Sequence, residues 1–246
     1  MSDLAIIGGS GLRSLNGLEI LRREVKQTPY GEPSSPLVHG LLCGKEIVFM
    51  VRHGVSHAIP PHRVNYRANL WALKDIGIEK LISIATVGGI TSELTPSRIA
   101  FPDQIIDYTW SRANTFFEDG IDQVIHIDFT QPYCEKLRQA LIRAAEEAGI
   151  EALAAGTYGA TQGPRLETAA EIERMARDGC DMVGMTGMPE AALARELDLG
   201  YATCAVVANR AAGRGREPLS MKVIEANLKV GMMQVQRLLQ YVIPMA

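Results

Sequence analysis

The sequence predicts an α/β fold in which helices flank a central, mostly parallel mixed sheet. Short apolar segments alternate along the chain with segments whose apolar residues recur at helical spacing. Several of the short segments are apolar at nearly every position, which is typical of strands covered on both faces. No linker-like segment interrupts this alternation, so residues 1–246 are expected to form a single domain.

The first four elements are predicted as strand, strand, helix and strand. Residues 4–7 are an apolar run that enters a glycine turn, and residues 46–51 are a second apolar run that ends in polar residues. A helix is predicted over 65–76 because leucine and isoleucine recur there at near-helical spacing, and Gly77 ends it. Residues 80–85 are predicted as a third strand, with a glycine turn directly after it.

The second half of the chain continues the alternation. Helices are predicted over 137–148, 168–177, 188–197 and 220–240, and strands over 153–161, 181–185 and 201–208. Ligands of such sheets bind beyond the carboxyl ends of the strands. Polar residues gather at these ends, which is the first functional signal: Ser10, Arg52, His53, Thr86, Glu167, Thr186 and Asn209.

The composition argues against several classes of function. The chain has 246 residues, a net charge of -3 and no block of like charges, so a nucleic-acid-binding face is not expected. No apolar stretch is long enough to span a membrane, and the N-terminus lacks the features of a signal peptide. The four cysteines form no metal-binding or redox motif, so free thiols in a reducing cytoplasm are expected.

A metal site is not predicted either. His53 and His57 are four residues apart, a spacing that could suit a metal ion on a helix. However, Gly54 and the Pro60-Pro61 pair indicate a loop, and no third ligand lies nearby in the sequence. The pair of histidines therefore does not predict a metal site.

Four strand ends carry donors that suit a small anion. The turn Gly8-Gly9-Ser10-Gly11 lets backbone N–H groups and a hydroxyl approach a phosphate. A dinucleotide fingerprint is excluded because Ser14 takes the place of its third glycine. Arg52 offers a fork of N–H donors, and Thr86 and Thr186 offer hydroxyls. A tight turn, a surface arginine and helix caps are the simpler interpretations, but one phosphate in a shared crevice would use all four donors.

Taken together, these residues resemble the family of trimeric purine nucleoside phosphorylases and methylthioadenosine phosphorylases, nearly from end to end. Similar segments occur in the same order: Ile6–Leu12, Arg52–Gly54 with His57, Asn65–Asn69 with Trp71–Lys74, Gly163–Arg165 with Glu167 and Thr168, Met185–Thr186, and Met188–Glu190. Several separated motifs in one order are more specific than a single glycine loop. The resemblance implies that phosphate attacks C1′ of a purine nucleoside, with no metal or organic cofactor.

The resemblance also implies roles for particular residues. Phosphate would be held by Ser10, Arg52, His53, Ala85, Thr86 and Thr186. The nucleoside would be bound by Val87, Leu166, Glu167, Met185, Asn209, Arg210 and Ala211, with His57, Leu219, Met221 and His126 towards its 5′ end. Catalysis would use Asn209, Glu167 and His53, because the reaction needs a positioned phosphate below C1′ and a donor for the departing base.

Glu167 and Asn209 predict which purine is bound. Alone, they would be a surface carboxylate at a helix N-terminus and a turn residue. The adenosine-type branch of the family has two aspartates around position 209 and a small hydroxyl residue at position 167, so this Glu/Asn pair resembles the inosine/guanosine-type branch instead. A carboxylate can accept the N1–H of a 6-oxopurine, and an amide can donate to its O6 or N7. A 6-aminopurine would meet mismatched partners, so strong selection against it is expected.

The 5′ end of the nucleoside is expected to lie against an apolar wall. Leu219 and Met221 occupy the region where the methylthio branch of the family has such a wall, which favours a thioether over a hydroxyl. The expected substrate is therefore 5′-deoxy-5′-methylthioinosine. Two alternatives remain within the family: an inosine/guanosine phosphorylase, in which His57 would donate to a 5′-hydroxyl, and a methylthioadenosine phosphorylase. A third, a nucleoside-binding protein without catalysis, would have no use for the phosphate donors.

The resemblance finally implies a homotrimer in which a neighbouring subunit completes the 5′ pocket. The segment His126–Tyr133 resembles the one that the neighbour supplies in this family. On the sequence alone, His126 is more simply interpreted as a surface histidine in a loop. The trimer, with His126 of one chain near the nucleoside of the next, is thus an expectation that rests on the family.

Overall fold

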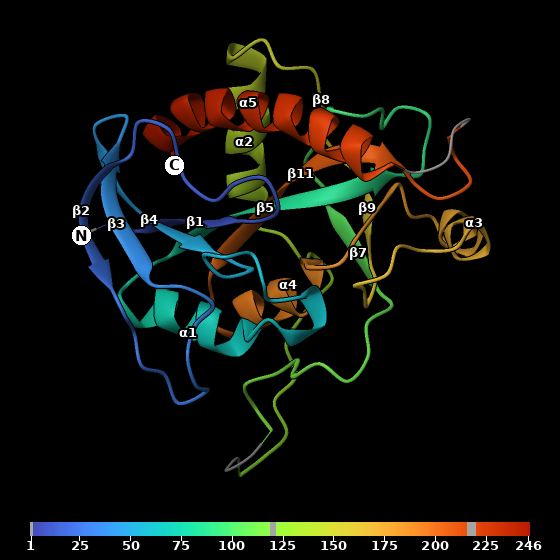
Figure 1. The fold of residues 1–246 in the computed structure, drawn as a ribbon. Coiled ribbons are helices and arrows are strands. Elements are labelled where there is room, and N and C mark those ends of the chain that lie inside the picture. The colour runs from blue at the N-terminus through green and yellow to red at the C-terminus, as the bar shows by residue number, and fades with distance from the viewer. Residues whose placement is uncertain (1, 119–121, 216–219) are drawn as a thin grey trace.

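The computed structural model describes residues 2–118, 122–215 and 220–246. A mixed sheet crosses the middle of the molecule, and helices cover both of its faces (Figure 1). Helices α2 (Glu135–Glu147) and α5 (Met221–Met245) lie on one face, and α1 (Tyr66–Asp75) and α4 (Gly187–Glu196) lie on the other. The predicted α/β fold, with helices flanking a mostly parallel mixed sheet, is confirmed.

Parallel strands form the centre of the sheet. They are β4 (Lys45–Val51), β1 (Leu4–Gly8), β5 (Lys80–Gly89) and β11 (Gly200–Arg210), in this spatial order. Gly8 of β1 lies opposite Val51 of β4, so the residues that follow these two strands emerge side by side. Asn209 of β11 lies opposite Gly88 of β5. The strand ends that carry the polar residues therefore meet at one edge of the sheet.

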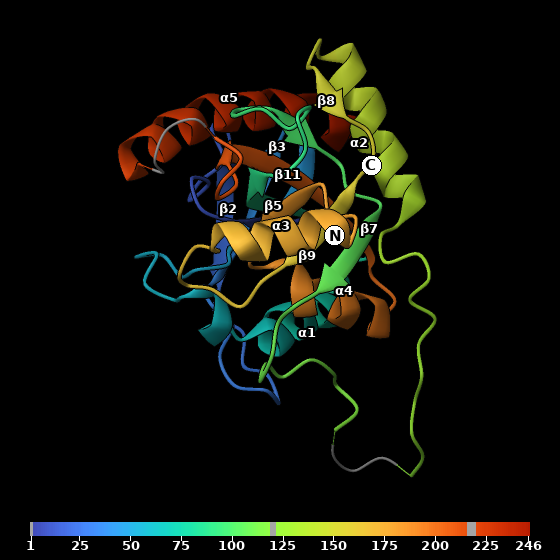
Figure 2. The ribbon, with the colours of Figure 1, turned by 90° about the vertical axis from the view of Figure 1, so that its right-hand side faces the viewer.

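Further strands extend the sheet on both sides. One side has β2 (Glu19–Glu24) and β3 (Leu37–Leu42), and the other has β10 (Met182–Gly184), β9 (Thr157–Ala160) and β7 (Gln104–Asp107). The short strand β6 (Ile99–Ala100) pairs with β11, and the short strand β8 (Ala152–Leu153) pairs with β6. The pairs β2–β3, β3–β4, β5–β10 and β6–β11 are antiparallel, which makes the sheet mixed. Helix α3 (Ala169–Arg177) lies near β7 and β9 (Figure 2).

Some predicted strand boundaries differ from the structure. The glycine turn expected after residue 85 is instead the end of β5, because residues 88–89 pair with residues 182–183 of β10. The strand predicted over 153–161 is divided between β8 and β9. Strands β2, β3, β6 and β7 were not expected: β6 and β7 are short, and β2 is exposed along nearly its whole length, so it lacks the apolar alternation of a half-buried strand.

The predicted helices all form, within a few residues at most ends. Helix α3 begins at a capping box, in which the side chain of Thr168 accepts from the backbone N–H of Glu171 and the side chain of Glu171 accepts from that of Thr168. Helix α5 continues to Met245, beyond the predicted residue 240, because Val242 and Ile243 extend its buried apolar face. No helix in the described ranges is both long and apolar enough to cross a membrane.

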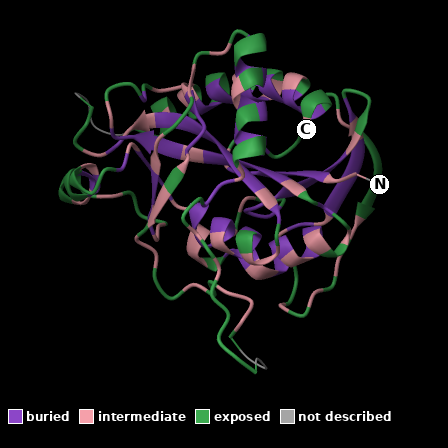
Figure 3. Cartoon of the chain, turned by 180° about the vertical axis from the view of Figure 1, so that it is seen from behind, coloured by how far each residue is buried: buried purple, intermediate pink, exposed green. Residues whose placement is uncertain are grey.

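Two apolar layers hold the helices to the sheet, and Figure 3 shows the buried strands between the partly exposed helices. One layer lies under α2 and α5 and includes Phe49 and Val235. The other lies under α1 and α4 and includes Met50 and Leu73. The neighbours Phe49 and Met50 face opposite layers, as the two-residue period of a strand requires. The strands that end at the polar edge are thus fixed from both faces.

Candidate active site

A cavity of about 1080 Å³ lies at the carboxyl ends of the central strands. Most of the residues predicted from the sequence line it: Ser10, Arg52, His53, His57, Thr86, Val87, Leu166, Glu167, Met185, Thr186, Asn209, Ala211 and Met221. They come from segments far apart in the sequence, so the fold brings the separate motifs to one place. Candidate phosphate donors and candidate base-binding groups therefore share a single cavity.

Three of the predicted residues that the structure describes are not brought into this cavity. Ala85 is buried within β5, and the guanidinium of Arg210 donates to the backbone carbonyls of residues 91–92 at 2.6 and 2.8 Å. Arg210 therefore fixes a neighbouring loop instead of facing the cavity, because the strand alternation turns it away from Asn209. His126 lies in an exposed segment of the same chain. Leu219 lies outside the described residues.

The glycine turn after β1 rests directly on β5. A Cβ atom at Gly9 would lie 2.5 Å from the carbonyl oxygen of Ile84 and 3.0 Å from Nη1 of Arg52, so only glycine fits at this position. The Thr86 hydroxyl donates to the carbonyl oxygen of Ser10 at 3.2 Å. The backbone of the turn is thus held against the strand end, and the Ser10 side chain lines the cavity.

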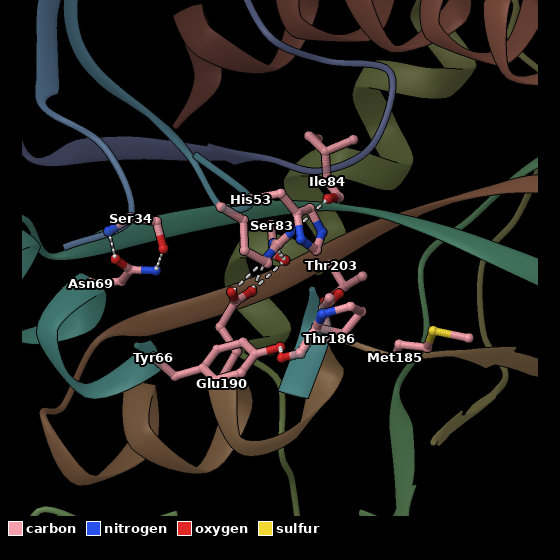
Figure 4. A network of polar contacts seen from close by, with 12 residues as sticks. Ser34, His53, Tyr66, Asn69, Ser83, Ile84, Met185, Thr186, Glu190 and Thr203 are labelled. Carbon is pink, nitrogen blue, oxygen red and sulfur yellow. Dashed lines mark hydrogen bonds and ion pairs between the residues drawn. The ribbon is translucent and has the colours of Figure 1, made fainter. Parts of the chain in front are cut away.

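Arg52 is fully buried, and most of its donors are already used. Figure 4 labels its partners Ser83, Ile84 and Glu190. Nε and Nη2 donate to the two carboxylate oxygens of Glu190 at 2.6 and 2.9 Å. Nη2 also donates to the Ser83 hydroxyl at 2.7 Å, and Nη1 donates to the carbonyl oxygen of Ile84 at 3.0 Å. Four of the five N–H groups therefore have partners. The expected two-pronged clamp on phosphate is wrong in this geometry, because at most one N–H of Nη1 remains.

Glu190 was not identified as a site residue from the sequence. Its side chain is fully buried at the start of α4 and accepts from Arg52, from the Ser83 hydroxyl at 2.7 Å and from the Tyr201 hydroxyl at 2.9 Å. Burial alone would disfavour the charge of Arg52, but the adjacent Glu190 carboxylate outweighs it and raises the pKa of Arg52. The only signal in the sequence was the motif Met188–Glu190, which does not show what Glu190 touches.

His53 is a neutral imidazole, and one of its two ring nitrogens is already hydrogen-bonded within the protein. Its Nδ1 donates to the carbonyl oxygen of Ile59 at 2.8 Å, because a carbonyl can only accept. Burial, followed by the positive charge of Arg52, lowers the pKa of His53 to about 4. Nε2 is then an acceptor, which suits the P–OH group of a hydrogen phosphate. The ring of His57 lies 4.9 Å from that of His53, and its Nε2 is 3.3 Å from Oγ of Ser10.

Thr186 stands at the N-cap position of α4, which was its simpler interpretation. Its side chain makes no capping hydrogen bond there, and its backbone N–H lies 3.4 Å from the Tyr158 hydroxyl. The hydroxyl of Thr186 is therefore not used by the helix and lines the cavity. The threonine is available as a donor to an anion.

Glu167 and Asn209 lie on the base side of the cavity, each half-buried and each with one side-chain atom fixed. The Thr161 hydroxyl donates to Oε1 of Glu167 at 2.7 Å, which leaves Oε2 to accept from a ligand. Nδ2 of Asn209 donates to the carbonyl oxygen of Arg210 at 2.7 Å, which leaves its second N–H. The site thus offers one acceptor and one donor, the pair that the N1–H and N7 of a 6-oxopurine require.

A register shift in the pairing of β11 with β5 lies directly before Asn209 and affects where its side chain points. The pairing of β11 with β5 shifts register between Val207 and Asn209, which leaves Ala208 without a partner on β5. The side-chain amide of Asn227, on α5, donates to the carbonyl oxygen of Ala208 at 2.9 Å. A bulge of this kind is not visible in the sequence, because it depends on the pairing of two distant strands.

Helix α5 covers the remaining side, with an apolar wall made of Met221, which was predicted there, and of Ile224, Leu228, Met232 and Met233. The polar side chains of Glu225, Lys229 and Gln236, on the same helix, also line the cavity. Methionine side chains are flexible and polarizable, so this wall can adapt to a thioether. Among the described residues, no group of three His, Cys, Asp or Glu side chains is arranged to hold a metal ion.

Comparisons with known proteins agree with this geometry. The family model described as the phosphorylase superfamily matches residues 3–244. A probable S-methyl-5′-thioinosine phosphorylase from Xanthomonas campestris is 52% identical over 226 residues, which cover 92% of this chain and 90% of that protein. A 6-oxopurine nucleoside phosphorylase from Pyrococcus furiosus is 46% identical over 232 residues, covering 92% and 86%.

Solved structures are similar along the whole chain. Methylthioadenosine phosphorylase from Schistosoma mansoni, in complex with adenine, has a TM-score of 0.94 at 32% identity, covering 100% of this chain and 92% of that one. The backbone is therefore shared with proteins named for a 6-aminopurine nucleoside, while the sequences with higher identity are named for 6-oxopurine nucleosides. The side chains on the base side of the cavity, and not the fold, have to account for such a difference.

Proposed function

This chain belongs to the phosphorylase superfamily, and we propose that it catalyses the reversible phosphorolysis of S-methyl-5′-thioinosine. Phosphate attacks C1′ while the bond from C1′ to N9 breaks, and the products are hypoxanthine and 5-methylthioribose 1-phosphate. The relatives named above are all nucleoside phosphorylases, so the reaction class is transfer of a pentosyl group to phosphate. No metal or organic cofactor takes part in this proposal.

The observation that carries the proposal is the position of Glu167 and Asn209 in the same cavity as the anion donors. Oε2 of Glu167 would accept the N1–H of the oxopurine, while the unused N–H of Asn209 would donate to N7. Negative charge builds on the purine as the glycosidic bond breaks, so a donor at N7 stabilises the transition state more than the ground state. This arrangement favours a 6-oxopurine over a 6-aminopurine.

Phosphate would bind at the other end of the cavity. The backbone and hydroxyl of Ser10, the hydroxyl of Thr186 and the remaining N–H of Arg52 would donate to its oxygens. The Thr86 hydroxyl would join them only by giving up its hydrogen bond to the carbonyl oxygen of Ser10. Nε2 of His53 would accept the P–OH hydrogen, since Nδ1 is the protonated nitrogen. The reacting oxygen would thereby be held in a fixed position, which lowers the entropic part of the barrier.

The apolar wall of α5 supports a methylthio group at C5′. A 5′-hydroxyl against Met221 and Ile224 would lose hydrogen bonds to water, whereas a thioether has none to lose. The relatives that share about half of their residues with this chain and are named for S-methyl-5′-thioinosine support the same assignment. His57, whose ring also lines the cavity, is the feature that would favour inosine.

We propose a homotrimer in which His126 of one chain approaches the nucleoside of the next. Support comes from the exposed segment that carries His126, which also exposes Trp110 and Val124, 67% and 72% of their surface. A fully active monomer in solution, by sedimentation and activity measured at the same concentration, would contradict it.

We also place the enzyme in the cytoplasm, where its four free cysteines would stay reduced.

A panel of nucleosides, each with and without phosphate, tests the proposed reaction. Hypoxanthine should be released from methylthioinosine in phosphate buffer, with a sugar 1-phosphate as the second product. The rate with inosine should be lower, because its 5′-hydroxyl would face the apolar wall. Equal release of base in phosphate-free buffer would show that the protein is a hydrolase. A higher kcat/KM for inosine than for methylthioinosine would favour an inosine/guanosine phosphorylase.

A further inference from the structure

Arg112 lies in a long arm between β7 and α2, residues 108–118 and 122–134, which extends away from the sheet (Figures 1 and 2). The residue is half-buried where the arm leaves the fold. No motif in the sequence marks it, and it does not line the cavity. Its side chain matters because it binds backbone carbonyls from several segments of the chain.

The guanidinium of Arg112 binds four backbone carbonyls at once. Nη1 donates to the carbonyl oxygens of Met185 and Met188, at 2.9 and 2.5 Å. Nη2 donates to those of Thr161 and Gln162, at 3.1 and 2.8 Å. Nε donates to the side-chain oxygen of Gln162 at 3.2 Å. These partners are uncharged, so the cation is stabilised by carbonyl and amide dipoles instead of a carboxylate.

These carbonyls belong to segments around the nucleoside half of the cavity, and those of Met185 and Met188 also flank Thr186, the proposed phosphate donor. Thr161 directly follows β9, and its hydroxyl donates to Glu167. Met185 follows β10 and lines the cavity itself, and Met188 lies in the first turn of α4. Four carbonyl oxygens that converge on one point repel one another unless a donor or cation fills that point. The placement of these three segments therefore depends on Arg112.

The arm is held firmly where it supplies this side chain. Ser111 has a φ of 53°, in the left-handed region that non-glycine residues seldom adopt. The backbone N–H of Trp110 donates to the same Gln162 side-chain oxygen at 3.2 Å. Such a conformation persists when the surrounding contacts determine it. Arg112 is thus directed inwards by its own backbone as well as by its partners.

We propose that Arg112 is a positioning residue that sets the geometry of the nucleoside half of the site and couples it to the arm. It acts through the main chain at Thr161, Gln162 and Met185, without touching the substrate. This inference rests on the proposed function, because it takes that half of the cavity as the nucleoside site. The coupling matters because the arm also carries His126, which we place near the neighbouring subunit's nucleoside.

The test compares Arg112→Met and Arg112→Lys with the control Arg195→Met. Arg195 also donates to two carbonyls of the arm, those of Asp128 and Gln131, but at its far end and away from the cavity. Lysine keeps the charge but offers one nitrogen, which cannot reach all four carbonyls. If the methionine variant fails to fold, the lysine variant carries the test.

Both Arg112 variants should raise the KM for the nucleoside about tenfold or more, and the KM for phosphate by less, since two of the four carbonyls flank Thr186. Amide hydrogen exchange in residues 161–168 should become faster in both, and neither change should occur in the control. Equal changes in the two KM values, or an unchanged nucleoside KM, would overturn the proposal. An unchanged rate of amide hydrogen exchange in residues 161–168 would overturn the role of Arg112, whether or not the native protein catalyses phosphorolysis. A native protein without phosphorolysis activity would refute the proposed function, and the exchange measurement would still test Arg112.

Discussion

The two halves of the cavity are built in different ways. In the phosphate half, Arg52 and Glu190 are both 0% exposed and share a hydrogen-bonded network in the centre of the fold. In the nucleoside half, Glu167 and Asn209 are half-buried, and Leu166 beside them is 44% exposed. The proposed phosphate donors lie at the ends of strands of the sheet, whereas Glu167 lies in a loop that Arg112 contacts from outside the cavity.

This difference fits the demands on each half. Phosphate is small and the same in every reaction of this kind, so its site can be rigid and pre-formed. The nucleoside is larger and has to enter and leave, so its site needs parts that can move. Under the proposed function, two half-buried side chains, Glu167 and Asn209, would select between purines, while the buried network would stay the same.

The largest effect is expected from a substitution in the proposed phosphate half of the cavity. Glu190→Gln removes the charge opposite Arg52 while it keeps the shape, and the unpaired buried cation should cost about 3–5 kcal/mol of the free energy of unfolding. The KM for phosphate should rise as well. Denaturant unfolding and phosphate titrations measure the two effects. In the control Glu173→Gln, which breaks exposed ion pairs with Arg177 and Arg214, the loss should stay below about 1 kcal/mol. A similar small loss for Glu190→Gln would show that the network is not needed.

A second, smaller effect concerns the nucleoside half alone. Asn209→Asp replaces an amide donor with an acceptor, so kcat for methylthioinosine should fall by about 10²–10³, as it does when a donor to developing negative charge is lost. The fold should be unaffected, because Asn209 is half-buried and its partner is an adjacent carbonyl. Steady-state kinetics and the unfolding midpoint measure this contrast. A rise in KM with an unchanged kcat would mean that Asn209 binds the base without stabilising its departure.

The sequence was sufficient for the parts of the site that depend on local pattern. Ser10 and Thr186 follow apolar strands directly, and their place at the polar edge follows from the alternation of strands and helices. Glu190 and Arg112 could not be found in this way. Glu190 binds Arg52, which is 138 residues away in the sequence. Arg112 binds backbone carbonyls, such as that of Met185, which every residue has and which therefore leave no pattern in the sequence. The same limit applies to the bulge at Ala208.

The smallest effect concerns the pH dependence of stability. His53 has a pKa of about 4 in the fold, below its usual value near 6.5, so its contribution is complete above pH 6.5 and is lost as the pH falls towards 4. Over that range the free energy of unfolding should fall by up to about 1.4 kcal/mol per pH unit from this residue. Denaturant unfolding of the native protein and of His53→Gln at several pH values measures it. Parallel curves for the two proteins would show that His53 is not buried in its neutral form.

The most direct test of the central claim is the ratio of kcat/KM for methylthioinosine to that for methylthioadenosine, measured on the native enzyme at saturating phosphate. The two nucleosides differ only in the purine edge that Glu167 and Asn209 would read. A site built around one donor pattern can reject the mismatched base by about 10⁴-fold, and we expect a ratio of that order in favour of methylthioinosine. Equal values for the two nucleosides would contradict the assignment of these residues to the purine edge.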